Sequence, residues 1–200
     1  LLAAIGPAWA NNAYHNLEAG SFAQDWSNAA LITANDDWSG VPSVIGYRGD
    51  GLAGGTGVDP QTILGEGTPV VDVNVNQTNP NTFTTGGVTE FAITDAVVAQ
   101  AGSNTARAPA LVIHLNTSNP YNIGITYNLR DIDGSTDNSI QPIALQYRIG
   151  SGGNFTNIPA GFVADASSGP SLATLVTPVS VTLPAAVENQ PQVQLRIITS

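Results

Sequence analysis

Three aspartates are concentrated in the segment 131–138, which reads DIDGSTDN. Asp131, Asp133 and Asp137 stand at the first, third and seventh positions of this glycine-containing loop. Carboxylates so close together repel one another, which makes a cation favourable, and Ca²⁺ accepts sets of about six to eight oxygen ligands in flexible geometry. We therefore predict that these three aspartates bind a structural calcium ion, the one cofactor that the sequence suggests.

The loop departs from the EF-hand pattern, in which a bidentate glutamate closes the set. Pro142 occupies that closing position, so a calcium site here needs ligands from other loops, with Asn138 as a local candidate. The alternative is a solvated connection between two strands, because Asp, Gly, Ser and Asn are common turn residues. The sequence is compatible with both interpretations.

A second candidate site lies in the segment 25–50, which combines aromatic side chains with four aspartates. Trp26, Trp38 and Tyr47 are of the type that stacks on the apolar face of a sugar ring, with carboxylates and amides beside them. This combination predicts a polysaccharide-binding face. The alternative is that both tryptophans anchor a core and satisfy their indole N–H groups locally.

The sequence predicts no catalytic residue. It contains neither a G-x-S-x-G nucleophile motif nor an H-E-x-x-H metal motif. His114 falls on the outward parity of its strand, far from His15 in the sequence. The fifteen carboxylates could include a glycosidase pair, but none has an apolar setting that would raise its pKa. We expect no enzymatic activity from this chain, with a glycan-acting enzyme as the remaining alternative.

The composition excludes several partners. Only 10% of the residues are charged, lysine is absent, and the formal net charge is −10. Such a surface repels phosphate backbones and anionic lipid headgroups, so we expect binding to neither nucleic acid nor membrane. The absence of cysteine rules out disulfides and thiolate metal sites. An acidic, lysine-free chain rich in Asn, Thr and Gly is typical of secreted bacterial proteins.

The first ten residues, LLAAIGPAWA, form an apolar run that ends in an A-x-A triplet. This pattern is typical of a signal-peptidase site, so we predict that residues 1–10 are the remnant of a secretory signal peptide. An apolar first strand or helix that packs on the domain is an alternative, and the end of a pilin-type helix is another. The run is too short to span a membrane. The remaining residues, 11–200, are expected to form one secreted domain.

The loop with three aspartates lies between two segments whose apolar residues alternate with a period of two. This period is typical of half-buried strands, because successive side chains point to opposite faces of a sheet. We predict that the two segments pair as one hairpin. The apolar faces consist of Ile123, Ile125, Tyr127 and Leu129 in the first arm and Ile143, Leu145, Tyr147 and Ile149 in the second.

The rest of the chain also favours strands over helices. Thirteen prolines and twenty-one glycines interrupt it, and no long window keeps a helical period. We predict an all-β fold, a mostly antiparallel two-sheet β-sandwich of the jelly-roll kind with little or no helix. A repeated DWS at 25–27 and 37–39 suggests a further hairpin around Leu31 and Ile32. The other predicted strands are 29–34, 42–48, 69–75, 88–100, 110–116, 178–183 and 192–199.

The last of these strands runs to Ser200 without a closing turn, so we expect a chain truncated at its C-terminus. An unfinished edge strand also invites self-association by addition of a strand from a neighbour. This leaves a structural subunit of a filament or surface layer as an alternative function.

Three segments, 37–52, 129–150 and 155–184, resemble a known type of domain. This is the N-terminal β-domain of large secreted bacterial proteins that often carry a lamin-tail domain and an endonuclease/exonuclease/phosphatase-family domain downstream. The resemblance covers most of residues 11–200. It implies an accessory role beside the downstream domains of the same polypeptide, and it supplies no catalytic residue. We therefore expect a non-catalytic accessory or binding module.

Overall fold

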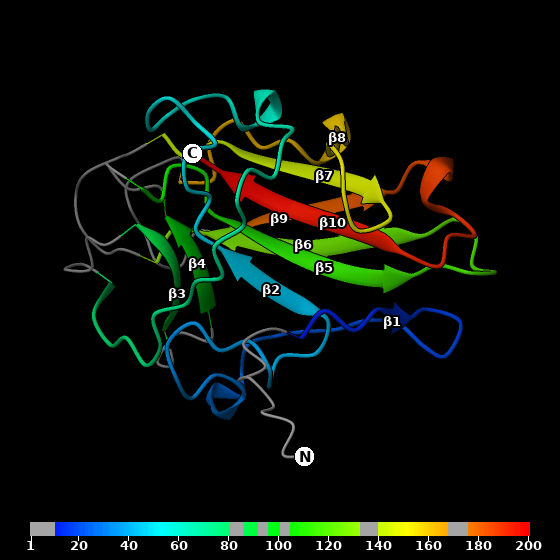
Figure 1. Ribbon diagram of the computed structural model, residues 1–200, viewed down its shortest axis with the longest axis horizontal. Coiled ribbons are helices and arrows are strands. Elements are labelled where there is room, and N and C mark those ends of the chain that lie inside the picture. The colour runs from blue at the N-terminus through cyan, green and yellow to red at the C-terminus, as the bar shows by residue number, and fades with distance from the viewer. Residues whose placement is uncertain (1–10, 81–85, 92–95, 101–104, 133–139, 168–175) are drawn as a thin grey trace, which may run out of the picture.

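A computed structural model describes residues 11–80, 86–91, 96–100, 105–132, 140–167 and 176–200. Within these ranges the chain is mostly β, with short 3₁₀ turns and no α-helix. The main unit is a mixed six-stranded sheet (Figure 1). Its strands are β1 (His15–Asn16), β2 (Val44–Tyr47), β5 (Ala110–Asn116), β7 (Ile143–Ile149), β8 (Thr156–Asn157) and β10 (Val193–Thr199).

The strands of this sheet follow the order β1-β5-β10-β7-β8, and β2 also pairs with β5. Only the β1–β5 pair is parallel among the described strands of the sheet. Because β10 occupies one edge of β5, the strands β1 and β2 share its other edge. The 3₁₀ turns lie in the connections, at η1 (Ala29–Leu31), η2 (Pro60–Thr62), η4 (Pro159–Gly161) and η5 (Ala185–Val187).

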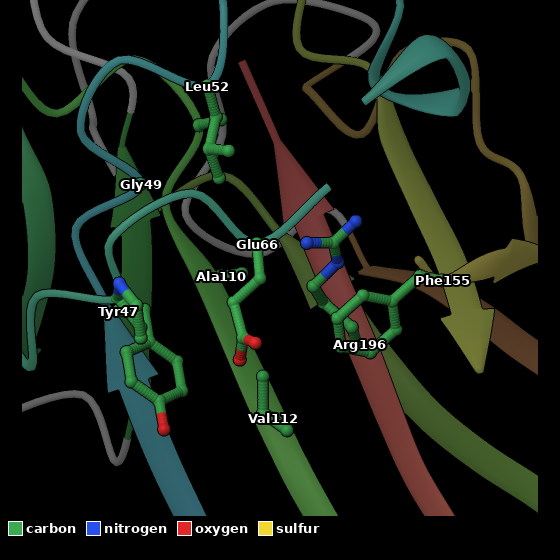
Figure 2. A pocket seen from close by; sticks show the side chains of 10 residues that line it. Tyr47, Gly49, Leu52, Glu66, Ala110, Val112, Phe155 and Arg196 are labelled. Atoms are coloured by element: carbon green, nitrogen blue, oxygen red, sulfur yellow. The ribbon is translucent and has the colours of Figure 1, made fainter. Parts of the chain in front are cut away.

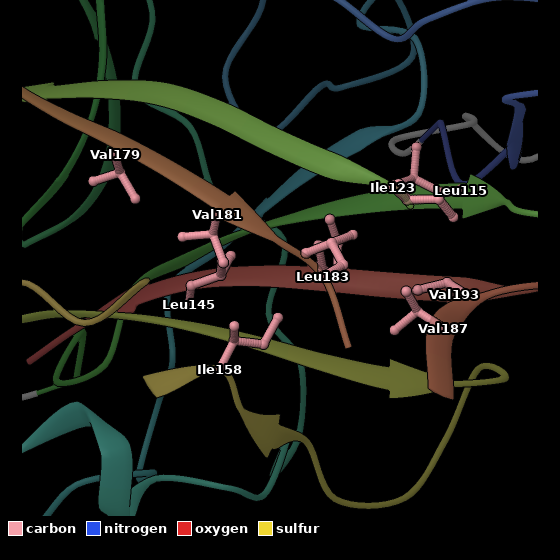
Figure 3. Close-up of a cluster of buried hydrophobic side chains, with 10 residues drawn as sticks. Leu115, Ile123, Leu145, Ile158, Val179, Val181, Leu183, Val187 and Val193 are labelled. Carbon is pink, nitrogen blue, oxygen red and sulfur yellow. The ribbon is translucent and has the colours of Figure 1, made fainter. Parts of the chain in front are cut away.

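Two smaller antiparallel sheets complete the described fold. One pairs β6 (Gly124–Arg130) with β9 (Val176–Thr182), and the other pairs β3 (Gly87–Phe91) with β4 (Ala96–Gln100). The β6–β9 sheet packs on the inner face of the six-stranded sheet. Figure 3 shows Val179, Val181 and Leu183 directed at Leu145 and Ile158 of the larger sheet and its margin. Burial of these aliphatic side chains holds the two layers together, at about 1.5–3 kcal/mol for each side chain fully removed from water.

The predicted hairpin of residues 121–149 is wrong, although both of its arms are strands. β6 pairs with β9, whereas β7 lies in the other sheet between β10 and β8. The two strands face one another across the core. Ile125, Tyr127 and Leu129 of β6 and Leu145 and Tyr147 of β7 are directed into it, whereas Ile149 is exposed. The segment 131–142 is much longer than the loops of about two to five residues that close hairpins, and the strands on either side of it belong to different sheets.

The prediction of a mostly β chain is confirmed, and several strand boundaries agree closely. The strand predicted at 110–116 coincides with β5, and those at 178–183 and 192–199 correspond to β9 and β10. The strand predicted at 88–100 is two strands, β3 and β4. A mixed six-stranded sheet faced by two strands is not a clear jelly roll.

Two further strand predictions fail for local reasons. Residues 29–31 form a 3₁₀ turn, because the Asn28 side chain accepts the Ala30 N–H at 3.1 Å and caps it. No hairpin therefore forms between the two DWS segments. Residues 69–75 contribute only isolated bridges, Tyr47 with Val71 and Asn74 with Thr89. In both segments, local hydrogen bonds or contacts with a neighbouring strand outweigh the preference of the apolar residues for a regular β-strand.

Cysteine pairs can test the β6–β9 pairing, since the chain contains no natural cysteine. Thr126 and Ser180 stand directly opposite one another and are exposed. We expect the double variant Thr126→Cys/Ser180→Cys to form a disulfide on mild oxidation, because directly paired residues meet the Cα separation of about 4.4–6.8 Å that a disulfide requires. A hairpin of residues 121–149 would instead pair Gly124 with Ile149. We expect the double variant Gly124→Cys/Ile149→Cys to stay reduced, because these two residues lie in facing sheets, which are about 10 Å apart. Non-reducing electrophoresis and mass spectrometry show whether each double variant forms its disulfide. A disulfide in Gly124→Cys/Ile149→Cys but not in Thr126→Cys/Ser180→Cys would contradict the topology.

Candidate functional site

A groove of about 1170 Å³ opens between the β6–β9 sheet and the inner face of the six-stranded sheet. Its floor is apolar and comes from β5, through Leu111, Ile113 and Leu115, and from β10, through Leu195 and Ile197. One wall is β6, whose residues line the groove at both odd and even positions. The segment 21–26 closes another side. A large apolar concavity with a few polar groups at its margin is the usual form of a binding site.

Trp26 is the one predicted aromatic ligand-binding residue that lines the groove. Its φ of 62° lies in the left-handed region, and the Gln24 side chain accepts its backbone N–H at 3.0 Å. Such a conformation costs roughly 1 kcal/mol or more for a residue with a side chain, so the surrounding contacts must hold it in place. The half-buried indole packs edge-on against Trp38, with ring centroids 6.3 Å apart. The indole is thereby held in a defined orientation at the groove.

Asp25 and Asp37, the acidic residues of the two DWS segments, form matching turns. Each accepts the backbone N–H of the serine two residues later, at 3.0 Å for Ser27 and 2.9 Å for Ser39. In Asp25 the Ser27 backbone N–H and then the Ser27 hydroxyl lower the pKa of the carboxyl. Asp25 is exposed and lines the groove, so its negative charge is available there.

Trp38 and Tyr47 lie elsewhere. Trp38 is fully buried, and its indole N–H donates to the Asp72 carbonyl at 3.2 Å. A side chain at Gly46 would meet the Trp38 ring at 2.4 Å, so the ring packs directly on the β2 backbone. Trp38 is thus the core anchor that the alternative interpretation described. Tyr47 is half-buried on the far side of the six-stranded sheet, where burial, followed by the Glu66 charge, raises its pKa.

The predicted calcium ligands are only partly described by the structure. Asp131 lines the groove beside β6, whereas Asp133 and Asp137 lie outside the described residues. Within the described ranges no three His, Asp or Glu side chains gather closely enough to hold a metal ion. The calcium site therefore stays a prediction.

The outer face of the six-stranded sheet carries a polar cluster that the sequence did not predict. The register of β5, β10 and β7 places His114, Gln194 and Arg148 in one row across the sheet. Arg196 and Gln146 stand in the next row. All five are at least 95% buried, because loops from the first half of the chain cover this face. Buried polar groups of this kind need hydrogen-bond partners.

Arg148 donates hydrogen bonds to a carboxylate and to a side-chain amide oxygen. Its two terminal nitrogens donate to the two Glu66 oxygens at 2.7 Å each, and its Nε donates to Gln194 Oε1 at 2.7 Å. The bidentate geometry matches the planar guanidinium and gives a stronger bond than a single contact. Arg148 is almost inaccessible, whereas the Glu66 side chain is 30% exposed, so the covering loop approaches the buried cation from the solvent side.

Arg196 has no carboxylate partner among its described contacts. Its Nε donates to Gln146 Oε1 at 2.8 Å, and its terminal nitrogens donate to the carbonyls of Ile63 and Gly65 at 2.6 and 2.7 Å. Burial, and then the nearby charge of Arg148, lower the pKa of Arg196 to about 9. The loop that follows η2 is therefore held to the sheet through its own backbone oxygens.

Both guanidinium groups also lie against the Phe155 ring. Their central carbons are 3.8 Å (Arg196) and 4.4 Å (Arg148) from the ring centroid. Figure 2 shows the ring beside Arg196, with Glu66 reaching in from the covering loop. Each cation–π contact contributes about 0.5–2 kcal/mol.

We call Glu66, Arg148, Arg196, Gln146 and Phe155 the arginine clamp, and its contacts indicate a structural role. The repeat Gln146-Tyr147-Arg148 and Gln194-Leu195-Arg196 is the signal that could have revealed it.

His114 sits at the edge of this cluster. It follows the outward parity expected from the sequence, but that face is covered and the ring is buried. Its Nδ1–H donates to the Ser43 carbonyl at 3.3 Å, and the Tyr14 ring packs edge-on against it at 5.3 Å. Burial lowers its pKa below the usual value, so the neutral ring is the native form near pH 7. These contacts account for the residue as part of the packing.

Comparison with known proteins identifies no relative: no protein-family model matches the chain, and no curated protein or solved structure is significantly similar to it. Among the described residues, no helix has the length and apolar character needed to cross a membrane. The groove and the arginine clamp are therefore the observations from which a function can be argued.

The two ion pairs of the described chain offer a matched test of the clamp. We expect Glu66→Ala to lower the free energy of unfolding by about 1.5–3 kcal/mol, because it leaves a buried guanidinium without its charged acceptor. Asp50→Ala removes the partner of Arg48 in a pair that is about one-third exposed, and it should cost less than about 1 kcal/mol. Urea denaturation of the two variants beside the wild type measures both effects. Equal losses would contradict a special role for the clamp.

Proposed function

We propose that this chain is a non-catalytic binding module and that its ligand lies in the groove between the two sheets. The observation that carries the proposal is the groove itself, with an apolar floor, an oriented Trp26 and the exposed carboxylate of Asp25 at one side. The arginine clamp supports it by holding the opposite face of β10, which contributes to the groove floor and lies beside β5. The groove is larger than the usual range of about 300–1,000 Å³ for small-molecule sites, which favours an extended ligand.

We further propose that the module belongs to a larger secreted bacterial protein and acts beside downstream domains of the same polypeptide. The acidic, lysine-free composition, the apolar run before residue 11 and the resemblance of residues 37–52, 129–150 and 155–184 support this context. We also propose that the chain forms a jelly-roll sandwich, and the facing arrangement of the six-stranded sheet and the β6–β9 pair supports this proposal.

Polysaccharide is the first ligand class to test, because Trp26 can stack on a sugar ring while Gln24 and Asp25 offer hydrogen-bond partners beside it. The expectation from the sequence included Trp38 and Tyr47. A fully buried Trp38 has no surface for a sugar, and Tyr47 lies on the other side of the sheet. The proposal therefore rests on Trp26 alone among the three.

If the groove binds polysaccharide, Trp26→Ala should weaken the binding at least about tenfold, because removing a central aromatic contact commonly costs more than about 1.4 kcal/mol. Affinity electrophoresis in gels containing xylan, β-glucan or glycogen measures the effect. Tyr121→Ala is the matched control, since Tyr121 is an aromatic residue that is 72% exposed and lies outside the groove. Unchanged retardation of a folded Trp26→Ala variant would contradict the proposal.

We also propose that a calcium ion stabilises the segment that follows β6 and that Asp131, Asp133 and Asp137 are its ligands. A ligand that binds only the native state raises the melting temperature. Addition of about 1 mM Ca²⁺, roughly a thousand times a micromolar dissociation constant, should therefore stabilise the chain by about 4 kcal/mol. EDTA should reverse the shift, and Asp133→Asn should abolish it. A melting temperature that is the same with calcium and with EDTA would contradict the site.

A structural subunit of a filament or surface layer is the second candidate function. The observation that favours it is the second edge of β6, which no described strand occupies. A strand from a neighbouring copy could pair there. The net charge of −10 on each copy opposes such assembly at low ionic strength, so we place this candidate second.

A further inference from the structure

One wall of the groove is a backbone edge. β6 pairs with β9 along residues 124–130, and no described strand pairs with its other side. Even-numbered residues of β6 have exposed side chains that point away from the core, yet Gly124, Thr126 and Asn128 also line the groove. Val176, Pro178 and Ser180 of β9 line the groove as well, so both strands of the smaller sheet border this space and the strand register decides which edge is open. The groove therefore offers main-chain groups as well as apolar side chains.

The register identifies which main-chain groups face the groove. The Leu183 N–H donates to the Ile123 carbonyl at 2.8 Å, so Ile123 and Leu183 form a hydrogen-bonded pair. Such pairs alternate along an antiparallel ladder, which makes the odd-numbered residues of β6 the ones bonded to β9. The N–H and C=O groups of Gly124, Thr126 and Asn128 consequently point to the opposite side, toward the groove.

The two edges of the β6–β9 sheet differ in how well they accept another strand. Pro178 of β9 stands opposite Asn128, at a position where an N–H would point outward from the β9 edge. Proline has no N–H to donate, and it is a common device against unwanted strand pairing at sheet edges. β6 contains no proline. Of the two edges, only that of β6 keeps a full row of donors and acceptors.

An added strand would also find a complementary floor. Leu111 and Ile113 of β5 are only half-buried and line the groove, together with the fully buried Val44 of β2. A strand placed about 4.8 Å beyond β6 would continue the two-stranded sheet across this floor. Its inward side chains, every second residue, would cover Leu111 and Ile113, and its outward side chains would face solvent.

Charge favours one kind of occupant over a second copy of this chain. Asp25, Asp131 and Arg130 line the groove, which leaves an excess of negative charge there, and the whole chain carries a net charge of −10. Two such copies repel one another at low ionic strength, whereas a segment with lysine or arginine beside its apolar residues is attracted.

We propose that the groove binds an extended peptide segment of a partner protein, which pairs antiparallel with the β6 edge as an additional strand. The segment has about the seven residues of β6, alternates apolar with polar residues, and carries basic residues at its ends. Main-chain hydrogen bonds supply affinity in this mode, and the inward side chains supply specificity. The proposal rests on the proposed binding function, because it names the occupant of the same groove.

The probe is the peptide acetyl-KTVTVTVTK-amide, titrated into the whole chain at low salt and followed by calorimetry. In an antiparallel pair with β6, its threonines lie opposite Gly124, Thr126 and Asn128, and their N–H groups bond to the edge. N-methylation of the two central threonines should weaken binding at least tenfold. N-methylation of the valines should leave binding within about twofold, since those N–H groups point away from β6.

A matched pair of variants of this chain tests the contribution of the β6 edge to the proposed strand pairing. Asn128→Pro removes one donor from the groove-facing edge of β6, and Thr182→Pro removes one from the outer edge of β9. Neither substitution touches a hydrogen bond between the two strands, because both residues occupy non-hydrogen-bonded pairs. We expect Asn128→Pro to weaken peptide binding about tenfold and Thr182→Pro to leave it unchanged. The N-methylated peptides give the answer even if a proline variant fails to fold.

Several outcomes would overturn the strand proposal. Equal effects of the two N-methylation patterns, or binding that is unaffected by both, would exclude pairing with β6. Dimerisation of the free chain at micromolar concentration that Asn128→Pro abolishes would make a second copy the occupant instead. Trp26-dependent polysaccharide binding without peptide binding would retain the binding module and overturn only the peptide. Failure of the wild-type chain to bind either probe would overturn both proposals.

Discussion

Two arginines buried in the middle of a sheet impose the constraint on which the other parts of this structure depend. Arg148 and Arg196 stand on neighbouring strands, on the face of the six-stranded sheet that loops cover. A buried guanidinium without acceptors is strongly destabilising, so the covering chain has to bring oxygens to both groups. It does so with the Glu66 carboxylate and with the backbone carbonyls of residues 63 and 65. The path of this loop is therefore determined by the positions of the two cations.

The clamp has a consequence for the opposite face of the same strands. Because the clamp anchors β10 and β7 from behind, the inner face of the sheet is a stable apolar surface on which the β6–β9 sheet can pack. That pair of strands covers only part of the surface, since the described six-stranded sheet is wider than two strands. The uncovered part is the groove, bounded by the β5 floor and the β6 edge. Binding in this protein, as we propose it, follows from a mismatch in width between two facing sheets.

Much of the fold could be predicted from the sequence, because the alternation of apolar residues is a local property of each strand. The residues 110–116 and 143–149 form strands, and the inward set of β6 is the predicted one, whereas Ile149 at the end of the predicted β7 face is exposed. Strand pairing could not be predicted in the same way. β6 and β7 direct their apolar residues into one core whether they pair side by side or face one another, so the pattern is identical for a hairpin and for two layers. The length of segment 131–142 was the local indication that favoured two layers.

For the candidate site, too, some features follow from the sequence alone and others only from the tertiary structure. The sequence by itself determined that the chain is β-rich, where its main strands lie, and which of their side chains point inward, because these properties depend on neighbouring residues only. Tertiary structure decided that Trp38 belongs to a core while Trp26 borders a groove, although both stand in identical DWS segments. It also decided that the outward residues Gln146, Arg148 and Arg196 are buried under a distant loop. Burial on the second face of a strand depends on contacts between residues far apart in the chain, and for that reason a period of two cannot reveal it.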